Sequence, residues 1–255
     1  MNILFEYLMK KMSQYPNAVI TDGVERIKYE ELLKYANQNY TKFTERKYGI
    51  ICKNAINAIK AVFCCLCSNS TAVIMSNRYG EYYCKKIVKK TRLSFLIDDD
   101  GVKEVAQRQH EIEDISDVAY IMCTSGTTGE PKAAMLTYKN ILSNVKDISK
   151  YFEINKNDRI LINRPLCHAS ALTGELFTSL VNGASIIISN TDYNPFEISN
   201  IMFKQNITTI CCTPTVLYQI ANVLERKNEK SKLRKIAVSG ECMTKSVSDT
   251  TKLWL

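Results

Sequence analysis

An α/β fold is predicted for this chain of 255 residues on three observations. Short apolar runs alternate with amphipathic segments through most of the sequence, as they do where parallel strands are joined by crossover helices. Apolar residues make up 45% of the chain, which is enough to bury a substantial core as one large domain or two modest ones. The sequence shows no strong linker, repeat or low-complexity segment that would interrupt this alternation.

The first half of the chain predicts a hairpin followed by repeated strand and helix units. Asp22-Gly23 separates two apolar runs, as a tight hairpin turn does. A helix over 29–40 would place four apolar side chains on one face: Leu32, Leu33, Ala36 and Tyr40. Strands are expected at 49–52, 71–75 and 94–98, with helices over 55–67 and 80–90 between them.

The second half continues the same pattern. Thr137 can cap a helix that runs to about Lys150 with a buried apolar stripe. Two more helices are expected to begin at Pro195 and Pro214, because proline is favoured at the first helical position. Strands are expected at 159–163, 184–189, 207–212 and 235–239, and the chain stops partway into another helical segment.

Composition argues against several classes of protein. No apolar run approaches the length that crosses a bilayer, and the first residues carry no small-residue cleavage site, so a cytoplasmic location is expected. The net charge of +8 comes from scattered lysines, without the basic and aromatic stripe that nucleic-acid binding favours. We therefore expect no nucleic-acid partner, although the excess positive charge suits anionic substrates.

The ten cysteines do not predict disulfides, because most of them lie inside apolar segments. Those expected to be reduced core residues are Cys52, Cys64, Cys65, Cys67, Cys123, Cys211 and Cys212. Cys64 and Cys67 have the CxxC spacing of some metal and redox sites. That spacing continues a helical apolar pattern, however, and the chain has only two histidines, so no metal site is expected.

The segment YIMCTSGTTGEPKAAML, at 120–136, combines an apolar strand with a loop that suits a polyphosphate. Glycines let the backbone approach an anion, hydroxyls add uncharged donors, and the lysine supplies positive charge. The residues expected to bind phosphate are Thr124, Ser125, Gly126, Thr127, Thr128, Gly129 and Lys132. The loop is not a Walker A motif, because Glu130 and Pro131 separate the second glycine from the lysine. The alternative interpretation is an ordinary Ser/Thr/Gly turn.

From Thr124 to Lys132 the loop resembles the signature of the adenylate-forming superfamily, which comprises acyl-CoA and aryl-CoA synthetases, adenylation domains of peptide synthetases, and luciferase. One departure is Ala133, where the family commonly has glycine. The resemblance implies the layered αβαβα N-terminal domain of these enzymes, incomplete at its C-terminal side, with approximate subdomains 1–165 and 166–255. It also implies that Lys132 and the hydroxyls hold the β and γ phosphates of ATP, which gives Lys132 a catalytic role.

The segment RPLCHASALTGEL, at 164–176, presents a histidine after a predicted strand. Taken alone, His168 would more often be a structural residue than a catalytic one. The acyl and aryl branch of the superfamily has a PLxHxxG-like segment here, matched by Pro165, Leu166 and His168, with Ala171 where glycine is usual. The resemblance implies that His168 lines the carboxylate-substrate pocket as a gate or hydrogen-bond donor.

The segment LRKIAVSGECM, at 233–243, is a predicted strand that ends in a small-residue turn. Ligands commonly bind at such turns in open α/β sheets, although a plain strand-to-helix turn is the alternative. The superfamily has a GGE or GGA turn beside the adenine, and Ser239, Gly240 and Glu241 occupy it here. Glu241 resembles the amino-acid-activating branch, whereas His168 favours an acyl or aryl acid. The histidine carries more weight because the resemblance places it against the substrate.

The resemblance implies activation of a carboxylic acid by ATP and Mg²⁺ as an acyl-adenylate, then thioester formation with CoA or a carrier-protein phosphopantetheine. Later family elements are absent from these residues: the YGxTE segment, the TGD aspartate, and the small C-terminal lid domain with the adenylation lysine. We therefore expect little activity from this chain by itself, and the remainder of a ligase chain as its partner. The alternatives are a noncatalytic nucleotide or acyl binding module and a fragment of an amino-acid-adenylation-like domain.

Overall fold

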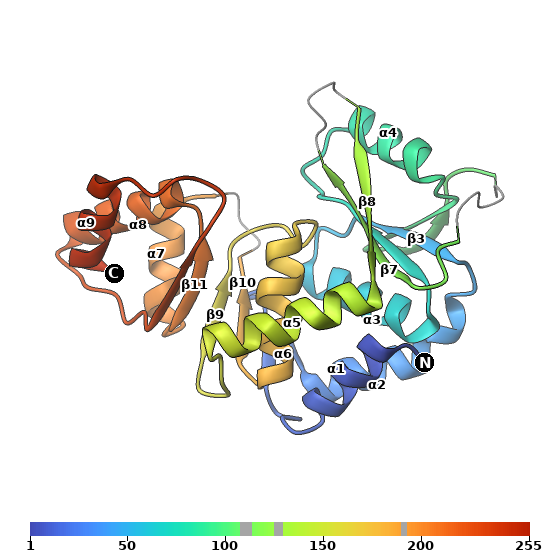
Figure 1. Cartoon of the computed structure of the whole chain (residues 1–255), viewed down its shortest axis with the longest axis horizontal. Coiled ribbons are helices and arrows are strands. Elements are labelled where there is room, and N and C mark those ends of the chain that lie inside the picture. The colour runs from blue at the N-terminus through green and yellow to red at the C-terminus, as the bar shows by residue number, and fades with distance from the viewer. Residues whose placement is uncertain (108–113, 125–129, 190–192) are drawn as a thin grey trace.

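The computed structural model describes residues 1–107, 114–124, 130–189 and 193–255. Its strands form two six-stranded sheets (Figure 1). In sheet A the order is β12 (Lys235–Val238), β11 (Thr209–Cys212), β9 (Arg159–Ile162), β10 (Ser185–Ile188), β1 (Val19–Thr21) and β2 (Arg26–Lys28). In sheet B it is β6 (Gly101–Glu104), β5 (Phe95–Asp98), β3 (Lys47–Ile50), β4 (Thr71–Ile74), β7 (Val118–Thr124) and β8 (Lys132–Thr137). The inner strands of both sheets pair in parallel, as the sequence predicted.

The helices follow the predicted alternation closely. They are α1 (Ile3–Met12), α2 (Tyr29–Asn39), α3 (Ala55–Ser68), α4 (Glu81–Thr91), α5 (Tyr138–Phe152), α6 (Thr178–Asn182), α7 (Pro195–Lys204), α8 (Pro214–Lys227) and α9 (Lys245–Trp254). The expected cap at Thr137 and the expected starts at Pro195 and Pro214 are confirmed. The side chains of Asn194 and Thr213 also accept hydrogen bonds from backbone N–H groups in the first turns of α7 and α8.

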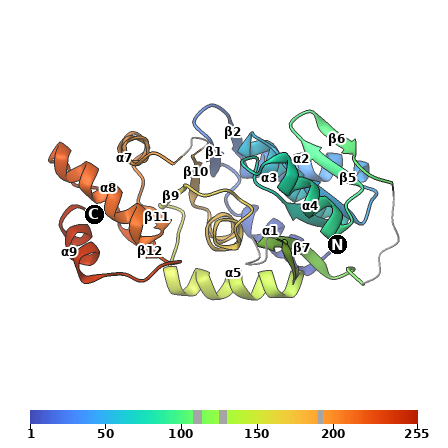
Figure 2. The same ribbon diagram turned by 90° about the horizontal axis from the view of Figure 1, so that it is seen from above.

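Alternating side chains of each central strand divide the core into layers. In β10, Ile186 and Ile188 join the large central cluster, whereas Ile187 packs with α7 and α8 on the outer face. In β4, Ile74 faces the central cluster and Val73 faces the cluster that includes Ile87 of α4. Helices therefore lie between the sheets and outside both of them, with α7–α9 and α4 at opposite ends of the molecule (Figures 1 and 2). This is the expected layered αβαβα arrangement.

The structure differs from the sequence-based expectations in several places, and α1, α6 and β6 were not predicted. Tyr40 does not lie on the buried face of α2, because the helix ends at Asn39 and Tyr40 begins a short 3₁₀ turn with 39% of its surface exposed. Strand β8 was not predicted, because it forms only through antiparallel pairing with β7. A π-helix at Ser170–Phe177 was not predicted either. The division near residue 165 stays a prediction, although β1 and β2 join sheet A from the other end of the chain.

The cysteines expected to be reduced core residues are all free thiols in the structure. Cys123 and Cys211 are half-buried, and the other five are buried. Burial raises the pKa of Cys64 to about 12, so its thiol is protonated at neutral pH. No group of three metal-ligating side chains gathers in the part of the chain that the structure describes. Within the same ranges, every helix is too short or too polar to cross a membrane.

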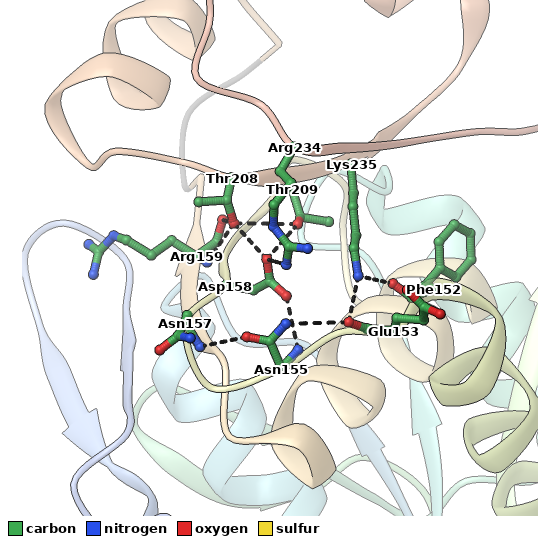
Figure 3. A network of polar contacts seen from close by, with 10 residues as sticks. All are labelled: Phe152, Glu153, Asn155, Asn157, Asp158, Arg159, Thr208, Thr209, Arg234 and Lys235. Atoms are coloured by element: carbon green, nitrogen blue, oxygen red, sulfur yellow. Dashed lines mark hydrogen bonds and ion pairs between the residues drawn. The ribbon is translucent and has the colours of Figure 1, made fainter.

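A polar network around Asp158 joins the amino ends of three strands of sheet A (Figure 3). Asp158 is 1% exposed and accepts hydrogen bonds from the Thr208 hydroxyl at 3.0 Å and the Asn155 N–H at 2.9 Å, and it also pairs with Arg234. The ammonium of Lys235 donates to two carbonyls at the end of α5. The network therefore sets the register of β9, β11 and β12, whose carboxyl ends carry candidate site residues.

Candidate functional site

The β7–β8 hairpin carries the predicted phosphate-binding residues. Thr124 ends β7 and Lys132 begins β8, and the two are register partners across the hairpin. Both side chains are exposed. Five of the predicted residues lie outside the described part of the chain: Ser125, Gly126, Thr127, Thr128 and Gly129. The described residues therefore fit a polyphosphate, because a hydroxyl at the end of β7 and an ammonium at the start of β8 both face solvent.

His168 lies after β9, at the start of the helical segment that continues as the π-helix. Its N–H donates to the Pro165 carbonyl at 3.1 Å, and its own carbonyl accepts from the Leu172 N–H at 3.0 Å. His168 as a whole residue is exposed. Partial burial of its ring and the charge of Arg164 nevertheless lower the pKa of His168. The imidazole is therefore neutral at pH 7 and can both donate and accept a hydrogen bond.

A buried arginine–glutamate pair that was not predicted from the sequence lies next to this segment. The Arg164 guanidinium lies 3.3 Å from the carboxylate of Glu175, which is 3% exposed within the π-helix. The same guanidinium lies 2.7 Å from the Cys211 sulfur at the end of β11. Burial raises the pKa of Glu175 to about 8, although Arg164 opposes this shift. The available signal was an acidic residue inside the apolar run LTGELFTSL.

The predicted adenine-side turn follows β12. The Ser239 N–H donates to the Cys212 carbonyl at 3.1 Å, and Gly240 adopts a φ of +95°, which favours glycine. Glu241 accepts hydrogen bonds from the hydroxyl of Thr215 at 2.5 Å and from its N–H at 3.3 Å. These bonds lower the pKa of Glu241 and hold its carboxylate at the amino end of α8. Ser239, Gly240 and Glu241 are all exposed.

Side-chain contacts link these separate segments. The Tyr79 hydroxyl lies 3.7 Å from the sulfur of Cys167, next to His168. The rings of Tyr79 and Tyr83 meet edge to face with centroids 5.0 Å apart, and both pack against the same apolar cluster as Cys123 of β7 and Ala133 of β8. Two tyrosines that the sequence analysis missed therefore connect the phosphate-binding hairpin to the histidine segment.

The opposite side of the histidine segment contacts sheet A. The Arg164 guanidinium contacts the sulfur of Cys211, and the N–H of Ser239 donates to the carbonyl of the next residue, Cys212. Parallel pairing places the carboxyl ends of β9, β11 and β12 at the same edge of sheet A. The residues after β9 also line one cavity with residues at the carboxyl ends of β3 and β4 of sheet B, where β7 pairs in parallel with β4. Ligands of open α/β sheets commonly bind at this edge.

A cavity of about 80 Å³ lies beside the histidine segment, between the two sheets. Its lining includes the cationic residues Lys53, Arg78 and Arg164, and no aspartate or glutamate among the described residues. The Asn163 amide nitrogen and Arg164 Nε are buried, and neither has a hydrogen-bond partner among the described residues. This donor set fits an anionic group, such as a carboxylate or a phosphate.

Comparison with known proteins agrees with these observations. A sequence model of the family described as "AMP-binding enzyme" matches residues 8–253. The chain is 24% identical to bacitracin synthase 1 of Bacillus licheniformis over 97% of its length, and 30% identical to feruloyl-CoA synthase of an Amycolatopsis species over 49%. It spans only 4% and 26%, respectively, of these relatives.

A solved structure supports the fold. The o-succinylbenzoate coenzyme A synthetase of Bacillus subtilis, in complex with AMP, aligns with a TM-score of 0.79 and 20% identity. The alignment covers 97% of this chain and 70% of that chain. The fold and the extent of the sequence match lead to one conclusion. The chain belongs to the AMP-binding enzyme family of the adenylate-forming superfamily.

Proposed function

We propose that this chain is the ATP-handling part of an AMP-forming acid–thiol ligase. Such a ligase joins a carboxylic acid to AMP and then transfers the acyl group to the thiol of CoA or of a carrier-protein phosphopantetheine. The observation that carries the proposal is the exposed pair of Thr124 and Lys132, which are register partners where β7 ends and β8 begins. His168 supports it, because its neighbour Cys167 contacts Tyr79, which packs in the same apolar cluster as Ala133 of β8. The chain spans only part of the length of its relatives, so the ligase activity is proposed for a whole protein of this kind and not for this chain alone.

The described residues would act mainly through position and charge. Lys132 would bind the β and γ phosphates and leave the α phosphate facing the acid, and Thr124 would add a hydroxyl donor. In this scheme ATP supplies the adenylyl group, and Mg²⁺ neutralises charge on the departing pyrophosphate. Neutral His168 would hold the acid carboxylate by donating a hydrogen bond. Partial burial and the charge of Arg164 lower the pKa of His168, which favours the neutral imidazole in this role.

The carboxylic acid is proposed to be an acyl or aryl acid. His168 supports this choice because it lies on the segment that matches the acyl and aryl branch. Glu241, which resembles the amino-acid branch, is already bonded to Thr215 at the amino end of α8. An amino acid is the second candidate, and it is favoured by the similarity to bacitracin synthase 1.

Binding of ATP to the purified chain tests the proposal. Calorimetric titration should show that Lys132→Ala weakens ATP binding by about tenfold or more, because a charge-assisted contact is lost. Lys139→Ala removes an exposed lysine from the nearby helix α5 and should leave the affinity unchanged. Unchanged affinity in Lys132→Ala would refute the assignment. Carboxylate-dependent pyrophosphate exchange by the chain alone would contradict the expected inactivity.

A further inference from the structure

We propose that Lys86 of α4 is a positioning residue for Lys132, acting through an ion pair with Glu130. This inference rests on the proposed function, because it assigns to α4 the task of placing the phosphate-binding lysine. Lys86 does not contact the ligand in this proposal. It holds the short segment through which the chain returns into β8.

The ion pair is well formed. The Lys86 ammonium lies 2.8 Å from a Glu130 carboxylate oxygen, and it also lies 4.8 Å from the centroid of the Tyr82 ring. The Lys86 side chain is 22% exposed, whereas that of Glu130 is 71% exposed. The lysine is therefore held by its own helix, and the glutamate comes to it from the hairpin. Only the buried Pro131 separates Glu130 from Lys132.

The position of β8 explains why the ion pair between Lys86 and Glu130 matters. β8 is at the end of sheet B and pairs only with β7 among the described strands. Lys132 and Ala134 are exposed, while Ala133 between them packs in the outer cluster that includes Ile87. Lys86 and Ile87 of α4 thus hold neighbouring points at the start of the edge strand. Edge strands without such support are more mobile than central ones.

The charges favour the pair at neutral pH. The hydrogen bond and charge of Lys86 lower the pKa of Glu130, and the charges of Lys89 and Lys90 contribute further. Glu130 in turn raises the pKa of Lys86. Both side chains are therefore ionised at neutral pH, at which ATP binding would be measured.

The same helix also reaches the acid side of the candidate site. Tyr83 of α4 packs on Tyr79, and Tyr79 contacts Cys167 beside His168. Helix α4 therefore contacts the segment before Lys132 directly, and it contacts the segment that carries His168 through Tyr79, which precedes the helix. This arrangement would keep the two reactants at a constant separation.

Variants of the chain test the role of Lys86. Lys86→Met and Glu130→Gln should each weaken ATP binding about two- to fivefold, as expected for loss of an exposed ion pair. The double variant should be no weaker than either single variant, and the exchange of Lys86→Glu with Glu130→Lys should restore part of the affinity. Lys85→Met is the matched control, because Lys85 pairs with Glu81 at 2.7 Å on the same helix, away from the hairpin.

The readouts separate positioning from folding. Calorimetric ATP affinity is measured beside the circular dichroism spectrum and the thermal midpoint, which should stay as in the wild type. In a ligase of the proposed function the same variants should raise the KM for ATP while kcat is kept. Additive effects of the two variants, or an equal loss in Lys85→Met, would overturn the inference. The proposed function would survive that result if Lys132→Ala still weakens binding, whereas a wild-type chain that binds no ATP would end both.

Discussion

The guanidinium of Arg164 lies 3.3 Å from the carboxylate of Glu175, but neither carboxylate oxygen accepts a hydrogen bond from the described residues. An ion pair of this kind is weak, because removing the charges from water costs more than the contact returns. Burial therefore dominates, and the pKa of Glu175 rises to about 8. The carboxyl group is mostly protonated at neutral pH and becomes charged only in alkaline solution.

Glu175 should make the chain less stable as the pH rises. The folded chain keeps a proton that the unfolded chain loses between about pH 4.5 and about pH 8, so the free energy of unfolding falls across this window. The slope is at most about 1.4 kcal/mol per pH unit. Urea unfolding at several pH values should show a flatter profile for Glu175→Gln. Glu225→Gln, on the exposed surface of α8, serves as the control. An unchanged slope in Glu175→Gln would exclude this residue as the cause.

The protonation of His168 should depend on Arg164. NMR titration should place the pKa of His168 below its ordinary value of 6.5, because partial burial and the nearby guanidinium both oppose a second positive charge. Arg164→Met should raise that pKa, whereas Arg226→Met on α8 should leave it unchanged. The spectrum of His168→Asn identifies the signal, since the chain has only two histidines. If the pKa of His168 is the same in the wild type and in Arg164→Met, the guanidinium does not influence the ring.

Asp158 should be among the residues that contribute most to stability. Asp158→Asn removes the charge that pairs with Arg234 and weakens the bonds from Asn155 and Thr208, at a cost of about 2–4 kcal/mol. Burial alone would raise the pKa of Asp158, but these hydrogen bonds lower it overall. The stabilisation is therefore present above about pH 4 and is lost in stronger acid. Asp147→Asn, on the exposed side of α5, should cost little in the same urea unfolding experiment. Equal losses would refute the role of the network.

Two glycines with positive φ should differ sharply in their tolerance of alanine. Gly183 has a φ of +74°, and an added Cβ would lie 2.4 Å from the Tyr15 ring. Gly23 has a φ of +90°, but no described atom lies within 4 Å of an added Cβ. Gly23→Ala should therefore cost about 1–2 kcal/mol from the backbone alone, and Gly183→Ala about 3 kcal/mol or more. Chemical denaturation measures both, and similar losses would contradict the predicted clash with Tyr15.

Many helices and turns could be predicted from the sequence, because the residues that specify them lie within or next to them. The caps at Thr137 and Thr213 lie immediately before the helices that they begin, and the Asp22-Gly23 turn lies between the strands that it joins. Strand β8 carried no comparable signal, since Ala133 and Ala134 favour a strand only when β7 is alongside. The end of α2 was missed by one residue at Tyr40 because helix boundaries depend on neighbouring packing.

The candidate site was accessible in part. The residues from Thr124 to Lys132 were recognisable by type and spacing, and their role in binding stays a prediction. Arg164 and Cys211 were not a recognisable pair, because 47 positions separate them in the chain. Nor did anything in the sequence pair Lys86 with Glu130, since a lysine on a helix usually faces solvent alone.

The sequence by itself determined the order of strands and helices and the chemistry of the loop between Thr124 and Lys132, because turn residues, caps and apolar periodicity act over a few positions. Only the tertiary structure decided how the two sheets stack and which strand ends meet. The physical reason is that burial of apolar surface is not directional, so an apolar face does not specify its partner. The packing of the whole chain determined which faces meet, and it placed Tyr79 beside Cys167 and Lys86 beside Glu130.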